Sequence, residues 1–388
     1  MKDEAERSLE HIWPDGLGGD WGPEFFRTRE VCGRCNNLLG QFVDGEFQRS
    51  FFAGVEASQG ALAFMATDRP GPLPLVYVGV FAETPSDTEI CESWLGPRGE
   101  RIFFFHGKDR DDLVGFAGGD PIRRGTSDAG RVYLSFSKPN LFWIGTAIQS
   151  VSKAFKKAEF RLLTRTDSEE LDKVCAPETP QSEKDRAYIG PLLQQRNPRT
   201  RLTVGLDHGM RFQCKLALGF GHALFGSAFA GEAYEQQLRA GLWERDIEKR
   251  QKLRIVGESM LAGRRDHDET ILGYPGAYTF AFVRSAAGVM LWIYAPSTRS
   301  LRTGILPGGD HLPSRLFERF GGGFVVLLVP GLQKHLGPYG LDTYVAHQHG
   351  GPKIDDLKAL EASRRSIEEV EHAVANWDIP EAGFEILR

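Results

Sequence analysis

The chain has 388 residues, of which 41% are hydrophobic and 26% charged, and its formal net charge is -5. This composition is ordinary for a folded protein with a sizeable core, and the length suggests two or three domains. Five cysteines without dense spacing argue against a disulfide framework, so we expect a reducing compartment, the cytoplasm. The longest strongly apolar run, 324–329, is too short to span a bilayer, so no membrane role is expected.

The first fifty residues contain an ordered series of metal-binding and turn-forming residue types. Glu10 and His11 are adjacent, Gly18-Gly19 follows, and the stretch from Cys32 to Cys35 runs directly into Asn36. Carboxylate and carboxamide oxygens are ligands that Mg²⁺ accepts, and an imidazole titrates near neutral pH, so it can take a proton from water. These residues therefore offer the groups that a metal-assisted attack of water on a phosphodiester requires.

The series Glu10-His11-Ile12-Trp13-Pro14, Leu17-Gly18-Gly19 and Cys32 to Asn37 resembles the HNH endonuclease family, in the variant whose final His is replaced by Asn. The resemblance implies a ββα-metal finger over residues 1–50. It implies that Glu10 and Asn36 bind the metal ion, Mg²⁺ or Mn²⁺, and that His11 is the general base that activates water. It also implies a nucleic-acid substrate, with DNA favoured over RNA, and a role in bacterial defence is a family-level expectation.

One part of the family pattern is missing. The zinc knuckle of such fingers uses two CxxC pairs, and only Cys32 and Cys35 are present here, either by divergence or because the true start lies upstream of Met1. A structural Zn²⁺ needs four ligands, so these two thiols form at most a partial zinc site. We therefore expect apolar packing to hold the finger, with a downstream domain covering part of it. The large side chains available for this packing are Trp13, Trp21, Phe25, Phe26, Leu38, Leu39, Phe42 and Phe47.

Two functions of different class remain open. The first is a metal-dependent HNH endonuclease that hydrolyses DNA, in which the residues after about Arg49 recognise the substrate, a signal or a partner. The second is a catalytically degenerate finger that acts as a nucleic-acid-binding or partner-docking module, which the missing CxxC pair and the acidic net charge would favour. A dimer would let two fingers cut opposite strands, but no heptad pattern requires one.

Any phosphate contact in an acidic chain must come from local clusters of Lys and Arg, which are otherwise solvated helix faces. Three stretches concentrate such residues: Lys153, Lys156, Lys157, Arg161 and Arg165; Arg196, Arg199 and Arg201; and Arg245, Lys249, Arg250, Lys252 and Arg254. Two other polar stretches, 264–269 and His347-Gln348-His349, combine His with polar or acidic neighbours. We expect both to be solvated turns rather than metal sites, and His222 to be a core or cap residue.

Beyond the finger, the sequence predicts an α+β protein, with a larger mixed α/β region that contains antiparallel strands and a helical block. Residues 51–165 are expected to be rich in β-structure, with strands at 73–81, 101–105 and 131–136 and a helix at 139–157. Residues 166–203 are polar and contain four prolines, which favours a loop or linker.

Residues 204–388 are expected to form the helical block, a β-hairpin and a C-terminal helix. The apolar spacing predicts helices at 210–229 and 234–252 and a last helix at 355–376. The hairpin is predicted from two apolar runs at 277–283 and 289–294, and 322–329 is expected to add a third strand.

Overall fold

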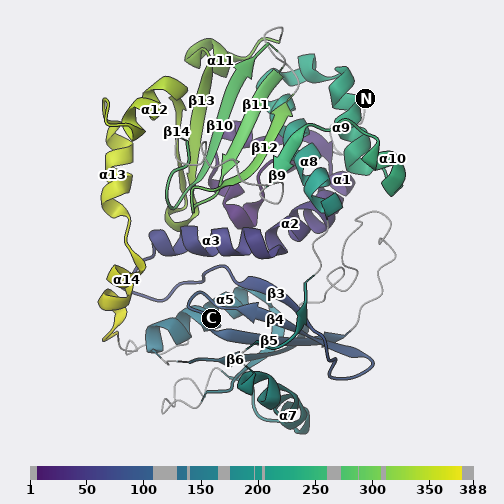
Figure 1. Cartoon of the computed structure of the whole chain (residues 1–388), viewed down its shortest axis with the longest axis vertical. Coiled ribbons are helices and arrows are strands. Elements are labelled where there is room, and N and C mark those ends of the chain that lie inside the picture. Colours follow the sequence, from purple (N-terminus) through teal and green to yellow (C-terminus); the bar gives the residue numbers. More distant parts are fainter. Residues whose placement is uncertain are drawn as a thin grey trace.

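The computed structural model describes residues 7–107, 129–137, 140–164, 175–195, 197–202, 206–259, 272–286, 288–306 and 312–377. Within these ranges the β-structure consists of a two-stranded hairpin and two six-stranded sheets. Figure 1 shows the two sheets in separate lobes, one above and one below helix α3 (Phe51–Ala63). The protein is therefore α+β, as the sequence predicts.

The upper sheet is antiparallel, with strand order β14-β13-β10-β11-β12-β9 (Figure 1). Its strands are β9 (Gly257–Ser259), β10 (Tyr278–Ser285), β11 (Gly288–Tyr294), β12 (Ser300–Leu306), β13 (Gly323–Val329) and β14 (Lys334–Gly340). The predicted hairpin is confirmed by the pairing of β10 with β11, and the predicted third strand, β13, lies on the other side of β10. Because helices cover both faces, β13 is apolar along its whole length: Phe324 and Val326 enter one core, and Val325 and Leu327 enter another.

Six helices of the described residues accompany this sheet. They are α8 (Leu206–Phe225), α9 (Ala233–Trp243), α10 (Ile247–Gln251), α11 (Arg315–Phe320), α12 (Leu341–Gln348) and α13 (Asp355–Ser363). Helix α14 (Ile367–Val374) follows α13 and packs instead with Ala61 of α3 and with Phe142 and Trp143 of the lower lobe. The sequence predicts α13 and α14 as one helix, and the structure divides it. Ser366 starts the second helix with a capping box, in which its hydroxyl accepts from the Glu369 amide and the Glu369 carboxylate accepts from the Ser366 amide.

The lower sheet has the order β7-β6-β5-β4-β3-β8, and only its β6–β7 pair is parallel. Its strands are β3 (Val76–Phe81), β4 (Glu89–Leu95), β5 (Arg101–Gly107), β6 (Ala129–Ser135), β7 (Lys157–Leu162) and β8 (Thr200–Arg201). On β5, Ile102 and Phe104 pack against α5 (Leu141–Ala154), whereas Phe103 and Phe105 enter the core on the opposite face. The apolar run at 101–105 is therefore a strand buried on both faces.

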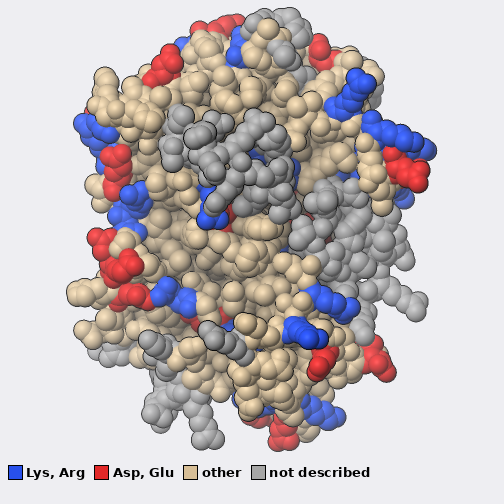
Figure 2. Space-filling view, in the orientation of Figure 1, with Lys and Arg blue, Asp and Glu red and all other residues tan. Residues whose placement is uncertain are grey.

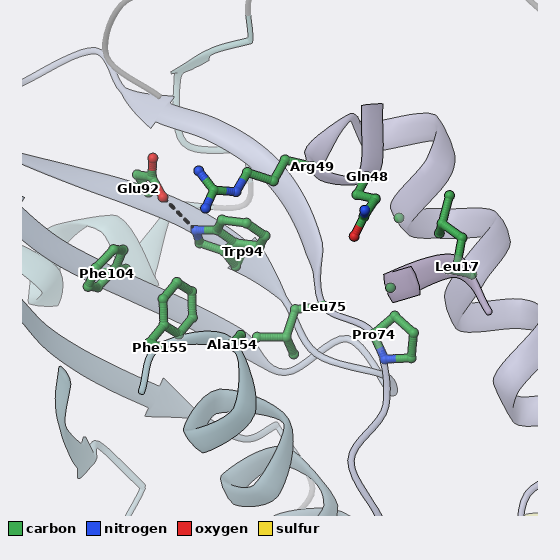
Figure 3. Close-up of a pocket in the computed structure, with 13 residues that line it drawn as sticks. Leu17, Gln48, Arg49, Pro74, Leu75, Glu92, Trp94, Phe104, Ala154 and Phe155 are labelled. Atoms are coloured by element: carbon green, nitrogen blue, oxygen red, sulfur yellow. Dashed lines mark hydrogen bonds between the residues drawn. The ribbon is translucent and has the colours of Figure 1, made fainter. Parts of the chain in front are cut away.

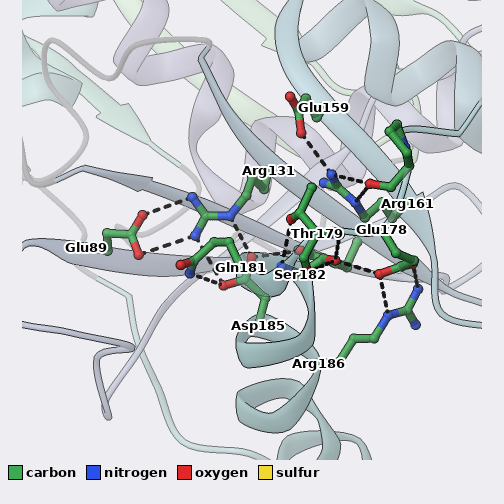
Figure 4. A network of polar contacts seen from close by, with 12 residues as sticks. Glu89, Arg131, Glu159, Arg161, Glu178, Thr179, Gln181, Ser182, Asp185 and Arg186 are labelled. Carbon is green, nitrogen blue, oxygen red and sulfur yellow. Dashed lines mark hydrogen bonds and ion pairs between the residues drawn. The ribbon is translucent and has the colours of Figure 1, made fainter.

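Helix α7 (Pro180–Gln194) covers that opposite face, and the prediction of a loop at 166–203 is wrong for this stretch. The prediction took the prolines as evidence against a helix. Pro180, however, occupies the first helical turn, where proline is tolerated, and Thr179 caps the helix. Figure 4 shows how polar side chains fasten α7 to the sheet. Arg131 of β6 lies 2.6 Å from Asp185 of α7 and 3.0 Å from Glu89 of β4.

A cavity of about 260 Å³ lies between the two lobes (Figure 3). Leu17, Gln48 and Arg49 line it from the N-terminal segment. Glu92 and Trp94 line it from β4, where the Trp94 indole donates a 2.8 Å hydrogen bond to Glu92. The N-terminal segment therefore borders the lower lobe through this cavity.

In the described part of the N-terminal segment, the large buried side chains belong to a core shared with the upper lobe. Ile12, Trp13 and Phe26 belong to the same buried cluster as Phe220 of α8 and Phe280 of β10. The Trp13 and Phe280 rings meet edge to face with their centroids 5.0 Å apart. Apolar packing against the upper lobe thus holds this segment in place. Every helix in the described ranges is too short or too polar to span a lipid bilayer.

Candidate functional site

The N-terminal segment is a ββα unit. Strands β1 (Arg7–His11) and β2 (Arg27–Cys32) pair antiparallel, and α1 (Gly33–Leu39) follows β2 without a break. Successive residues of a strand point to opposite faces. The adjacent side chains of Glu10 and His11 accordingly have different partners, and two polar clusters result.

The loop after β1 requires both glycines of the Leu17-Gly18-Gly19 sequence. Gly18 ends a short 3₁₀ turn (Asp15–Leu17) with a φ of 98°, in the left-handed region that favours glycine. A Cβ on Gly19 would lie 1.9 Å from the Trp13 carbonyl oxygen, so no larger residue fits there. The loop folds back on β1 and brings Asp15 and Asp20 to His11.

The first cluster surrounds the imidazole of His11. Nδ1 lies 2.8 Å from Asp15 Oδ1, and Nε2 lies 3.0 Å from Asp20 Oδ1. The His11 side chain is 18% exposed, whereas both carboxylates are more than half exposed. Partial burial raises the pKa of Asp15, an effect that the nearby His11 opposes. The ring is therefore held between two acids at the protein surface.

Lys215 of α8 is the centre of the second cluster. Its Nζ lies 2.7 Å from Glu10 Oε1 and donates hydrogen bonds to Asp44 Oδ2 at 2.6 Å and to the His11 carbonyl oxygen at 2.8 Å. All three side chains are largely buried. Burial raises the pKa of Glu10 and of Asp44, and in both cases Lys215 opposes the shift. An ammonium ion thus lies at the carboxylate that the sequence predicts to bind a metal.

Two further observations show that this second cluster adjoins a cavity and has a spare acceptor. A cavity of about 250 Å³ between the hairpin and helices α8 and α9 is lined by Glu10, Lys215 and Cys35, among others. Within the described part of the chain, Asp44 Oδ1 is buried and accepts no hydrogen bond. The cluster therefore has more carboxylate oxygens than one ammonium group satisfies.

Asn36, the second predicted metal ligand, lies on α1 and contacts the hairpin. Its Nδ2 donates to Ser8 Oγ at 2.9 Å and to the Leu9 carbonyl oxygen at 2.8 Å. Its Oδ1 therefore points away from these two acceptors. The structure places Asn36 beside the residues that precede Glu10, and it holds α1 against β1.

The predicted partial zinc pair marks the start of α1. Cys32 caps the helix, and its Sγ accepts a hydrogen bond from the Cys35 amide at 3.3 Å. Cys91 and Cys214 are buried in two different cores, so neither completes a site with this pair. Among the residues that the structure describes, His11, Asp15 and Asp20 form the one group of three or more His, Cys, Asp or Glu side chains close enough to share an ion.

The other sequence candidates have structural roles where they can be seen. His347 is fully buried and lies 3.1 Å from Glu361, so the prediction of a solvated turn is wrong for this residue. Arg161 and Arg250 of the basic stretches are also buried, and both donate to backbone carbonyls. Arg165, Arg196 and the stretch 264–269 lie outside the described residues. On the face shown in Figure 2, Lys and Arg are dispersed among acidic residues rather than gathered in a stripe.

Sequence reasoning missed Asp15, Asp20, Asp44 and Lys215. The first two had a usable signal, because each borders a glycine in the loop after His11, where a short acidic side chain can turn back. Lys215 had a weaker signal: it interrupts the apolar face of a predicted helix, where an ammonium group needs a partner.

Comparison with known proteins agrees with the ββα geometry. Residues 1–52 match the family model described as HNH endonuclease. A search of curated proteins and a search of solved structures found no match. The first 52 residues of this chain are thus similar to the HNH endonuclease family, and the match supports the resemblance that the motifs show.

Proposed function

We propose that the protein is a metal-dependent endonuclease that hydrolyses DNA phosphodiester bonds, with His11 as the general base. The observation that carries this proposal is the contact of His11 Nδ1 with the Asp15 carboxylate at 2.8 Å. A carboxylate at one nitrogen fixes the tautomer and orientation of an imidazole, so the other nitrogen can accept a proton from water. Asp15 has this orienting role, and Nε2 is the nitrogen that accepts the proton once water replaces the Asp20 carboxylate, which lies 3.0 Å from it.

We assign the metal to Glu10 and Asn36, as the family resemblance implies. The available oxygens fit Mg²⁺ or Mn²⁺, because Glu10 offers a buried carboxylate that lines a cavity, and Asp44 Oδ1 beside it is buried without a hydrogen bond. When bound, the ion would stabilise the charge that develops on the phosphate and on the leaving oxygen.

DNA would approach the face of the hairpin that carries His11. Arg27 lies directly opposite His11 in the strand pairing and is partly exposed. Arg29 and Arg34 are exposed on β2 and α1. Such residues can contact a phosphate backbone although the whole chain carries a net charge of -5.

The test is nicking of supercoiled plasmid by the full chain in the presence of Mg²⁺ or Mn²⁺. We expect the parent protein to nick, His11→Ala to be inactive, and removal of the metal by a chelator to stop the reaction. His349→Ala is the matched control, because His349 is exposed on the upper lobe and should leave activity unchanged. Equal nicking by the parent and His11→Ala would exclude His11 as the base.

A second candidate function is favoured by one observation, the ion pair between Lys215 and Glu10. If that pair is permanent, the finger cannot bind a metal through Glu10 and acts instead as a nucleic-acid-binding or docking module. A gel-shift experiment beside the nicking assay separates the two functions. DNA binding by the parent and by His11→Ala, without nicking by either, would favour the docking module.

A further inference from the structure

Lys215 reaches the finger from a distant part of the chain. It lies on α8, 204 positions after His11, and its side chain is 3% exposed. Its neighbours on that helix, Phe212 and Leu216, are fully buried apolar residues. A lysine at such a position is unfavourable unless its charge is compensated, and the compensating groups all come from the first 44 residues.

The surroundings of the ammonium group resemble those of a metal ion. Three oxygen atoms lie 2.6 to 2.8 Å from Nζ: one from Glu10, one from Asp44 and the carbonyl oxygen of His11. Oxygen atoms of these kinds are also the ligands of Mg²⁺ and Mn²⁺. The cluster contains two carboxylates and one ammonium group, so it attracts further positive charge.

A divalent cation and this ammonium group would compete for Glu10. A cation at bonding distance from Glu10 Oε1 would lie within a few ångströms of Nζ, where the repulsion of the two charges in a buried site is large. Rotation of the flexible lysine side chain into the adjoining cavity would relieve it, since Lys215 itself lines that cavity.

We propose that Lys215 is a positioning residue that competes with the divalent metal for Glu10, so that metal binding requires displacement of the ammonium group. The inference rests on the proposed function, because it takes Glu10 as a metal ligand. It deepens that function by linking metal binding to α8, which packs against the upper sheet. The same ammonium holds the His11 carbonyl oxygen, so its displacement also releases the backbone of the general base.

The first test is calorimetric titration of the full chain with Mn²⁺. We expect Lys215→Met to bind Mn²⁺ at least about tenfold more tightly than the parent, a difference equal to about 1.4 kcal/mol. Glu10→Gln combined with Lys215→Met should lose the gain, because the contested carboxylate is gone. Lys249→Met is the matched control, since the side chain of Lys249 is 69% exposed, and it should bind like the parent. Equal or weaker binding by Lys215→Met, or a gain that persists without Glu10, would overturn the inference.

The second test uses the parent protein and does not depend on a variant that folds. Acetylation of lysines by a water-soluble reagent, mapped by mass spectrometry, should spare Lys215 without metal and modify it when Mn²⁺ is bound. Lys249 should react equally in both conditions. Bound Mn²⁺ with unchanged protection of Lys215 would overturn the competition.

Different results would overturn the competition between Lys215 and the metal and the proposed nuclease function. If the parent nicks DNA, His11→Ala does not, and Lys215→Met binds Mn²⁺ no more tightly, then only the competition is overturned. If neither the parent nor Lys215→Met binds Mn²⁺, both the competition and the metal dependence of the proposed function are overturned.

Discussion

His11 and Asp15 are four residues apart in the sequence, and the loop between them places His11 Nδ1 2.8 Å from Asp15 Oδ1. The 3₁₀ turn that carries Asp15 is closed by Gly18 in the left-handed conformation. The orientation of the imidazole is therefore a property of the loop as well as of the strand.

Replacement of Asp15 by Asn should lower nicking activity by about 10- to 100-fold, because the amide no longer fixes the tautomer of His11. Initial rates of plasmid nicking at saturating metal measure this. Asp68→Asn is the control, since Asp68 is an exposed acid near α3 and its side chain contacts neither cluster. A rate equal to that of the parent would show that Asp15 does not orient the base.

Gly19→Ala should lower the free energy of unfolding by about 1–3 kcal/mol, because the new methyl group would overlap the Trp13 carbonyl oxygen and displace the loop. Chemical denaturation followed by tryptophan fluorescence measures this loss. Gly40→Ala is the matched control: nothing lies within 4 Å of a Cβ there, and Ala favours the helical backbone. If both variants were equally stable, the steric explanation of the second glycine would fail.

The five cysteines should differ in their reaction with a thiol reagent at pH 8. Burial raises the pKa of the Cys214 thiol to about 12 and also raises the pKa of Cys91, so both stay protonated and inaccessible. Cys32, Cys35 and Cys175 are partly exposed and should react in the native protein. Mass spectrometry of peptides from the native and the guanidinium-unfolded protein tests this, and early labelling of Cys214 would contradict the buried position on α8.

A peptide of residues 1–52 should not fold alone, because its apolar side chains complete a core with α8 and the upper sheet. Far-ultraviolet circular dichroism of the peptide should show no cooperative thermal transition, whereas the full chain should show one. Metal-dependent nicking by the peptide would mean that the finger is a self-sufficient unit.

The sequence predicted most where the determinants are local. The Glu10-His11 pair, the two glycines and the CxxC-Asn series lie within 27 residues, and the ββα unit follows from them. The strand at 101–105 could also be predicted from the sequence, since a strand covered on both faces needs apolar side chains throughout.

The remaining features depend on partners that are distant in the sequence. Helix α7 contains two prolines, which argue against a helix in the sequence. Its apolar residues Ile189 and Leu192 stabilise it by packing against the lower sheet, a partner that the local sequence does not show. In the sequence, Lys215 is a charged residue on the apolar face of a helix, and its role becomes clear only from its three oxygen partners in the structure. His347 similarly looks like part of a polar turn, although Glu361 and the Ile354 amide satisfy both its nitrogens inside the fold.

The finger shares the core of the upper lobe, so substitutions far from His11 can abolish the proposed cleavage. A random screen for inactive mutants should return changes at Phe220 or Phe280 as readily as changes beside His11, because those rings support Phe26 at the end of the loop. Selection for cleavage would therefore limit sequence changes in α8 and β10 as well as in the hairpin. A recombination event that exchanges this finger would also have to exchange the residues of α8 and β10 that pack against it.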